Sequence, residues 1–220
     1  MKTFSMQHPE KGEIAYTDRK RYLWISALFF PLVALSGIGL YSWNGSEWSF
    51  VVPLVLFYGG TALFDWLLGE DTSNPPEELV PQLEADAYYR WLPILTVPMH
   101  FAVLIAVAWF AGTHDVSWPA LLALALTAGL YSGIGVNTAH ELGHKKTDLE
   151  RWMARIVSAV PAYGHFCVEH NRGHHRHVAT PADPASSRMG ENIYKFACRE
   201  IPGAFRRGWS AEKERLARQG

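Results

Sequence analysis

Four long apolar stretches limit the possible folds of this chain more than any other feature of its sequence. A helix that crosses the ~30 Å hydrocarbon layer of a bilayer needs roughly 20 mostly apolar residues. The stretches at 23–40, 49–68, 91–110 and 118–136 approach or meet that length, and charged residues are nearly absent from them. Trp and Tyr gather at their ends, as is typical of a membrane–water interface. Four buried helices of a large soluble protein fit these features less well, so the sequence predicts an all-α integral membrane helical bundle.

The remaining segments divide the chain into three parts. We expect a polar N-terminal tail at 1–22, a transmembrane region at 23–136 and a histidine-rich helical portion at 137–220. The tail carries charges of both signs and lacks the pattern of a cleavable signal peptide. Residues 151–165 are apolar on balance but too short to span, which predicts an interfacial or re-entrant helix. Residues 203–220, with mixed charge, predict a surface helix.

The distribution of basic residues predicts the orientation in the membrane. Of the 20 Lys and Arg, five lie in residues 1–22, one is Arg90 between the second and third spans, and 14 follow His144. The connections at 41–48 and 111–117 contain none. Because basic residues stay on the cytoplasmic side, we expect the N-terminus, the 69–90 loop and everything after the fourth span to be cytoplasmic.

Net charge and cysteine content exclude other classes of protein. The formal net charge is −1, so no basic surface field favours nucleic acid. Cys167 and Cys198 do not have the spacing of a zinc ribbon or a disulfide scaffold, which suits a reducing cytoplasmic face.

Histidines are concentrated directly after the fourth apolar stretch. Seven of the ten fall within residues 140–177. His140 and His144 are four residues apart, which places both rings on one face of a helix. His170 and His174 repeat the spacing, and His175 adds a third ring. Imidazole is a good ligand for iron, copper, nickel and zinc, so the pattern predicts a metal site.

The histidine pattern is compatible with more than one metal. His140-Glu141-x-x-His144 matches the zinc-protease signature, in which the glutamate acts as general base. Under that hypothesis three further rings are available where one is needed. The number of imidazoles exceeds what one tetrahedral zinc ion needs, which favours two metal ions. Nitrogen ligands that leave open coordination positions suit iron that activates dioxygen.

Five sequence segments resemble one known family. These are NTAHELGHKK at 137–146, EHNRGHH at 169–175, VATPADPAS at 178–186, NPPEE at 74–78 and VPMH at 97–100. The first two resemble the first two histidine boxes of the bacterial membrane alkane monooxygenases (alkane omega-hydroxylases), within the membrane fatty-acid desaturase and hydroxylase superfamily. The resemblance extends over nearly the whole chain.

The resemblance implies a non-haem di-iron site and O2-dependent terminal hydroxylation of medium-chain n-alkanes to primary alcohols. It also implies a bacterial inner membrane and electrons from rubredoxin, which an NAD(P)H-dependent rubredoxin reductase reduces. It assigns iron-ligand roles to five residues: His140, His144, His170, His174 and His175. His177 lies outside the family pattern and is expected at the surface, and His165 is expected to be structural or to lie beside the ligands.

The family pattern also includes later ligands, a lone histidine and a third histidine box that follow two more spans, for six spans in all. This sequence ends at Gly220 without them. We therefore expect an N-terminal portion that is inactive alone, because five rings do not complete two iron sites.

Other polar residues are candidates to hold or orient the metal ligands, since bound imidazoles usually donate their second N–H to a carboxylate or carbonyl. Ionisable groups inside spans are functional hypotheses by default, although an interhelical hydrogen bond is the simpler explanation. The candidates are Asn137, Glu141, Glu169, Asp183, His100 and Asp65.

An alkane has no polar group, so its site must be an apolar cavity among the spans. The expected lining residues are Leu54, Phe57, Tyr58 and Leu130. The 14 basic residues after His144 are candidates to dock an acidic electron carrier.

Three alternatives remain open on sequence alone. A related membrane desaturase or an aryl-methyl hydroxylase would use similar histidine boxes. A zinc membrane protease would use His140, Glu141 and His144. A membrane scaffold with an incomplete metal site would have no catalytic function.

Overall fold

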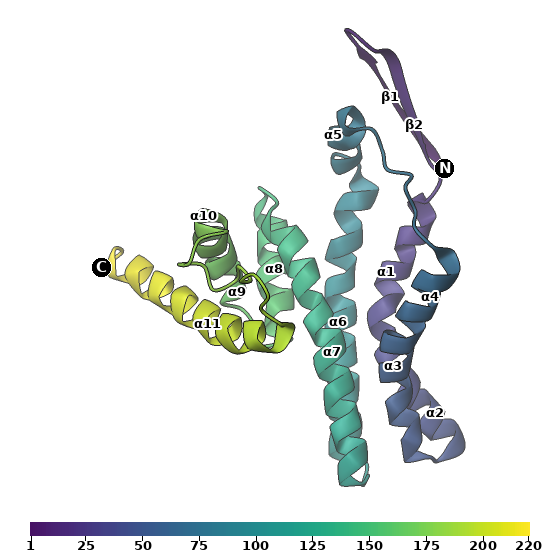
Figure 1. The fold of residues 1–220 in the computed structure, drawn as a ribbon. Helices are drawn as coiled ribbons and strands as arrows, with labels where there is room; N and C mark the ends of the chain where they lie inside the picture. The colour runs from purple at the N-terminus through teal and green to yellow at the C-terminus, as the bar shows by residue number, and fades with distance from the viewer. The chain divides into compact units, whose positions relative to one another are not determined.

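The computed structural model describes all residues from 1 to 220, and its chain divides into two compact units at 1–134 and 135–220. Nearly all of its regular structure is helical, which confirms the predicted all-α membrane bundle (Figure 1). The elements before the long helices are β1 (Lys2–His8), β2 (Gly12–Asp18), η1 (Arg21–Ile25), α1 (Ser26–Phe29), η2 (Phe30–Leu35), α2 (Ser36–Asn44), η3 (Glu47–Val51), α3 (Val52–Val55), η4 (Leu56–Gly60), α4 (Thr61–Leu68), η5 (Glu77–Leu79) and α5 (Val80–Glu84). They are followed by α6 (Ala87–Thr113), α7 (Trp118–Gly143), α8 (Asp148–Ala159), α9 (Phe166–Glu169), η6 (His170–His174), α10 (His175–His177) and α11 (Ile193–Ala217).

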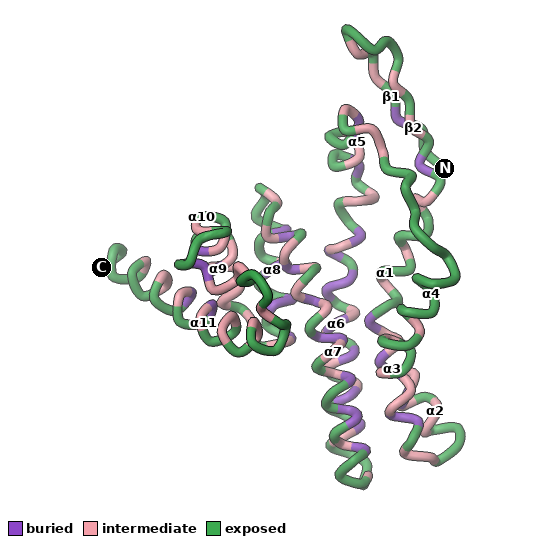
Figure 2. The backbone as a smooth tube through the Cα atoms, in the orientation of Figure 1, coloured by how far each residue is buried: buried purple, intermediate pink, exposed green.

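Four helical stretches are long and apolar enough to cross a membrane, at 21–44, 47–68, 87–113 and 118–143. All four predicted spans are confirmed as such candidates. Most of the helices extend a few residues beyond the apolar runs. Only 17% and 6% of the most apolar windows of the first two stretches are buried, so most of their side chains are free to face lipid (Figure 2).

The first unit has an aromatic core at the loop between the first two stretches. The rings of Tyr41 and Phe50 stack at 4.9 Å, and Phe110 of α6 packs edge-on against Tyr41 at 5.6 Å. Gly37 allows this close packing, because a Cβ there would lie 3.0 Å from the carbonyl oxygen of Ser49. Side chains of α2, η3 and α6 therefore share one core.

Residues 2–18 form a β-hairpin that the sequence analysis did not anticipate. β1 and β2 pair antiparallel, from Lys2 opposite Asp18 to His8 opposite Gly12. Gly12 has a φ of +73°, a left-handed conformation that glycine adopts without strain. The alternation of polar and apolar residues along both strands was the sequence signal for this hairpin.

The hairpin segment is tied to the acidic loop between the second and third stretches. Asp86 accepts contacts from Lys2 at 2.9 Å and from Arg21 at 2.7 Å. Lys11 pairs with Glu78 at 2.5 Å, and Lys20 pairs with Asp71. These ion pairs place residues 1–22 and the 69–90 loop at the same end of the helices.

We predict that acid releases the hairpin from this loop. The Lys20 partner holds the pKa of Asp71 well below its usual range, and Arg21 does the same for Asp86. A lowered carboxyl pKa stabilises the docked state in full above the pKa of the free group, ~4, and this stabilisation is lost as the pH falls below it. Hydrogen-exchange protection of residues 2–18, corrected for intrinsic rates, should therefore drop below about pH 4. Equal protection at pH 7 and pH 3 would contradict the prediction.

In the second unit, α9 and η6 pack against α11, and α8 packs against α9. α8 begins at Asp148 and ends at Ala159, two residues before Pro161, so the predicted helix at 151–165 is confirmed only in part. The predicted surface helix at 203–220 starts too late. α11 begins at Ile193, because the side chain of Asn192 accepts a hydrogen bond from the Lys195 N–H at 3.0 Å and caps the helix. Pro202 lies inside the helix.

Candidate metal centre

The first two histidines of the site lie at the end of α7. The helix continues unbroken from Trp118 to Gly143, and His144 extends its last turn through a hydrogen bond to the carbonyl of His140. The two rings are 4.6 Å apart. The i,i+4 spacing therefore gives the expected result, with two imidazoles on one face.

The second group of histidines lies in an irregular part of its helix. Residues 170–174 form a π-helical turn, which is frequent at functional sites. The Nε2 atoms of His170 and His175 are 3.0 Å apart in this turn. The ring of His174 stacks on that of His170 at 5.3 Å, so the pairing that the four-residue spacing predicted is present as well.

Four imidazoles converge on one point. The ligand nitrogens of His140, His144, His170 and His175 all lie within 4.8 Å of one another. The Nε2 atoms of His144 and His170 are 3.4 Å apart. Nitrogens bound at about 2.0–2.1 Å to one metal ion are separated by roughly 3–4 Å. The two shorter separations, 3.0 and 3.4 Å, match this spacing, and the donor set is one that suits a metal ion bound by imidazole.

Burial favours the neutral form of two of these rings, His170 and His144. Burial, reinforced by the neighbouring imidazoles of His140 and His175, lowers the pKa of His170 to about 4. Burial and the same kind of neighbours lower the pKa of His144. Because only the neutral ring offers a lone pair to a metal, His170 and His144 are ready to bind one near neutral pH.

His174 lies beside this group and has its own partner. Its Nδ1 is 2.8 Å from Oδ2 of Asp183, a carboxylate that is only 2% exposed. The hydroxyl of Ser186 donates to the same oxygen at 2.6 Å. Burial alone would raise the pKa of Asp183, but hydrogen bonds from Ser186 and His174 bring it to about 2. A carboxylate that accepts from Nδ1 fixes the tautomer and leaves Nε2 as the ligand atom.

The other candidate residues near the boxes have different surroundings. Glu169 is 3% exposed, and its carboxylate is bound by Arg207, not by a histidine. Glu141 and Asn137 are exposed on α7. His177 is bonded through Nδ1 to the Gly173 carbonyl at 3.1 Å. Of the proposed orienting residues, Asp183 makes a direct hydrogen bond to a box histidine.

The candidates within the spans lie in the first unit. His100 is 2% exposed on α6 and hydrogen-bonds the backbone of Tyr131, which matches the interhelical alternative. Asp65 is exposed on α4. Phe57 packs in an aromatic group with Phe30 at 6.1 Å and Tyr131 at 5.9 Å.

The other residues that were predicted to line a substrate cavity differ in how far they are buried. Leu130 packs against the core cluster of the first unit, and Leu54 is partly buried. Tyr58 is 67% exposed. Of these predicted residues, Phe57 and Leu130 therefore pack against other side chains of the first unit.

Several curated proteins are similar to this chain over nearly its whole length. An alkane 1-monooxygenase from Pseudomonas putida is 55% identical over 205 residues, which cover 93% of this chain and 51% of the relative. One from Ectopseudomonas oleovorans has the same identity and coverage, and one from Alcanivorax borkumensis is 54% identical over the same lengths. The model of the fatty acid desaturase family matches residues 116–219.

The chain belongs to the alkane 1-monooxygenase family. The family resemblance predicted from the histidine boxes is thereby confirmed. The chain spans about half of the length of the curated alkane 1-monooxygenases that it matches.

Two residues beside the alkane 1-monooxygenase histidine boxes were missed from the sequence. Phe166 stacks on His170 at 4.7 Å, and its position four residues earlier was a usable signal. Arg207 contacts Glu169, 38 residues away, and Asp183, 24 residues away. No local pattern indicates a contact over such separations.

Proposed function

We propose that this chain provides part of the catalytic centre of a membrane enzyme that uses O2 to hydroxylate the terminal carbon of medium-chain n-alkanes, giving primary alcohols. The observation that carries the proposal is the convergence of four imidazoles, from His140, His144, His170 and His175, in a chain that is 55% identical to alkane 1-monooxygenases.

The donor set supports iron over zinc. Structural zinc sites commonly include thiolates, and the four converging ligands here are all imidazoles. The zinc-protease hypothesis requires Glu141 as a general base, but the relatives are named monooxygenases. Two non-haem iron ions are proposed on the basis of the family resemblance. His140, His144, His170 and His175 would hold one ion, and His174, oriented by Asp183, would contribute to the other.

The positions of the residues suggest which role the metal, the imidazoles and the apolar helices would each have. Bound iron supplies the activation of dioxygen. The imidazoles hold the metal at the end of α7, the last of the four apolar helices. An apolar substrate would reach the site from the bilayer. The N-terminus, the 69–90 loop and the histidine boxes would share the cytoplasmic side of the bacterial inner membrane, since an even number of spans separates them.

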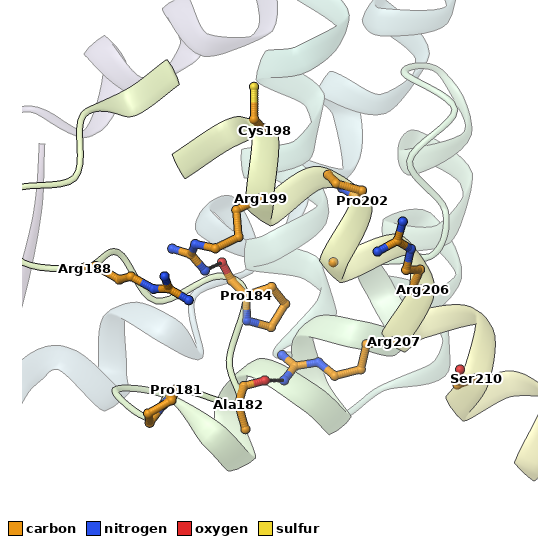
Figure 3. A pocket seen from close by; sticks show the side chains of 11 residues that line it. Pro181, Ala182, Pro184, Arg188, Cys198, Arg199, Pro202, Arg206, Arg207 and Ser210 are labelled. Carbon is orange, nitrogen blue, oxygen red and sulfur yellow. Dashed lines mark hydrogen bonds between the residues drawn. The ribbon is translucent and has the colours of Figure 1, made fainter. Parts of the chain in front are cut away.

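An arginine-lined hollow in the second unit supports docking of an acidic electron carrier. The hollow has a volume of about 660 Å³ between α11 and residues 181–188. Arg188, Arg199, Arg206 and Arg207 line it (Figure 3). Arg199 and Arg207 bond carboxylates of the chain itself. Arg188 and Arg206 are exposed and available to an acidic partner. We propose rubredoxin, reduced by an NAD(P)H-dependent reductase, as that partner.

A chimaeric enzyme tests the proposed function. The chain replaces the matched region of the Pseudomonas putida relative, and membranes are assayed with n-octane, rubredoxin, its reductase and NADH. We expect conversion to 1-octanol, and none when His170→Ala is introduced. Folded chimaera in the membrane without alcohol formation would count against the proposal, as would equal activity of the His170→Ala form. Desaturated products would favour the desaturase alternative.

We predict that Phe57→Ala in this chimaera shifts the product distribution toward longer alkanes. Phe57 packs against Phe30 and Tyr131, so its removal would extend an apolar space by the volume of one ring. Gas chromatography of products from an equimolar alkane mixture measures the shift. The control is Leu67→Ala in the neighbouring helix, since Leu67 is 59% exposed. An unchanged chain-length profile for Phe57→Ala would remove this residue from the substrate site.

A further inference from the structure

Two carboxylates are buried beside the second histidine box. Glu169 precedes His170 and is 3% exposed, and Asp183 is 2% exposed. A buried carboxylate is costly unless a positive charge and hydrogen bonds compensate it. The arrangement therefore needs a cation close to both groups.

Arg207 of α11 supplies that cation. Its Nε donates to Oε1 of Glu169 at 2.8 Å, and its Nη2 contacts the same oxygen. Nη2 also donates to Oδ1 of Asp183 at 2.8 Å. Nη1 donates to the carbonyl of Ala182 at 3.0 Å, a contact drawn in Figure 3. One planar guanidinium thus joins two carboxylates and the backbone between the box and α11, a geometry that a lysine ammonium does not reproduce.

The contact continues to a box histidine through Asp183. Its Oδ1 accepts from Arg207, and its Oδ2 lies 2.8 Å from Nδ1 of His174. The guanidinium therefore fixes the carboxylate that orients the imidazole. Orientation of a ligand ring by such an outer partner typically changes metal affinity by about 10–100-fold.

Gly173 makes room for the guanidinium. A Cβ at this position would lie 2.6 Å from Nε of Arg207 and 2.8 Å from Oε1 of Glu169. The residue between Arg172 and His174 is thus small where α11 approaches the box. The guanidinium of Arg207 therefore fits beside the second histidine box because Gly173 has no side chain there and because Glu169, Asp183 and the Ala182 carbonyl accept its hydrogen bonds.

We infer that Arg207 is a positioning residue for the metal centre: by joining Glu169 and Asp183 it holds His174 with its Nε2 presented as a ligand. α11 is then part of the metal centre although it contains no histidine. The inference rests on the proposed metal-binding function.

Metal binding by the full 220-residue chain in detergent tests it. Co²⁺ is used as the probe, because its visible absorption reports ligand number and geometry. We expect Arg207→Gln to weaken the binding of the ion that involves His174 by about 10–100-fold and to change its Co²⁺ spectrum. Arg207→Lys should restore little. The matched control is Arg206→Gln, since Arg206 is the exposed neighbour on the same helix and lines the same hollow. It should bind Co²⁺ like the parent chain.

A second variant covers the case in which Arg207→Gln loses its helical structure. Asp183→Asn keeps the shape of the side chain but removes the charge, and it should show the same loss of affinity and the same spectral change. The inference is overturned if a folded variant at either position keeps the parent's Co²⁺ affinity and spectrum. A parent chain that binds no Co²⁺ at all would instead refute the proposed metal site.

Discussion

Replacing His170 by alanine is expected to lower the metal affinity of the four-histidine cluster by at least about 100-fold, more than the loss of an orienting partner costs. His170 is the centre of the cluster, since its Nε2 lies 3.4 Å from that of His144 and 3.0 Å from that of His175. Its removal leaves three imidazoles and breaks the pairing with both neighbours. Metal content after dialysis against a weak chelator measures the effect.

His177→Ala is the matched control for this prediction. His177 belongs to the same histidine-rich segment, but its ring is bonded to the Gly173 carbonyl and is not part of the cluster. We expect unchanged metal content. If His170→Ala retained as much metal as His177→Ala, the cluster would not be the binding site.

Gly203→Ala is expected to destabilise the second unit, although the same change in an open helix stabilises it by about 1 kcal/mol. Gly203 lies within α11, where a Cβ would be 2.6 Å from Cβ of Pro184. The proline ring is rigid and cannot rotate away. Overpacking of this kind costs about 1–3 kcal/mol. We therefore expect a net loss on the order of 1 kcal/mol, which is the balance of these two values.

Thermal unfolding in detergent and hydrogen exchange of α9 and α11 measure this loss. The melting temperature should fall by a few degrees. Metal affinity should fall as well, because Pro184 follows Asp183, the partner of His174. Gly164→Ala is the control, since no atom lies within 4 Å of its added Cβ. A higher melting temperature for Gly203→Ala would show that the loop around Pro184 yields to the extra methyl group.

The membrane helices were predictable because their signal is local. Each depends on a single run of apolar residues, and no long-range contact is needed to recognise it. The predicted ends of these helices were less accurate. The third helix starts at Ala87 because Asp86 caps it by accepting from the Tyr88 N–H at 3.0 Å, a feature outside the apolar run. The hairpin at 2–18 was missed because its polar–apolar alternation is short and lies among charged residues of both signs.

The composition of the candidate site was predictable, and its arrangement was predictable in part. The spacing of His140 and His144 sufficed because α7 contains His140 and its last turn extends to His144 through a backbone hydrogen bond. The same spacing predicted the stacked pair of His170 and His174, but it gave no indication of the π-helical turn in which the Nε2 atoms of His170 and His175 lie 3.0 Å apart. Arg207 could not be predicted, since it reaches Glu169 across 38 residues of chain. Local periodicity indicates which residues are candidate metal ligands, whereas backbone irregularity and long-range contacts decide how they are grouped.

Metal analysis of the purified chain tests the central claim most directly. The chain is produced in cells supplied with both iron and zinc, isolated without oxygen and analysed by mass spectrometry for metals and by Mössbauer spectroscopy. The four-imidazole cluster of His140, His144, His170 and His175 predicts bound iron with the signature of high-spin ferrous ions in nitrogen-rich coordination. Folded chain that contains zinc alone, or no metal, would contradict the account.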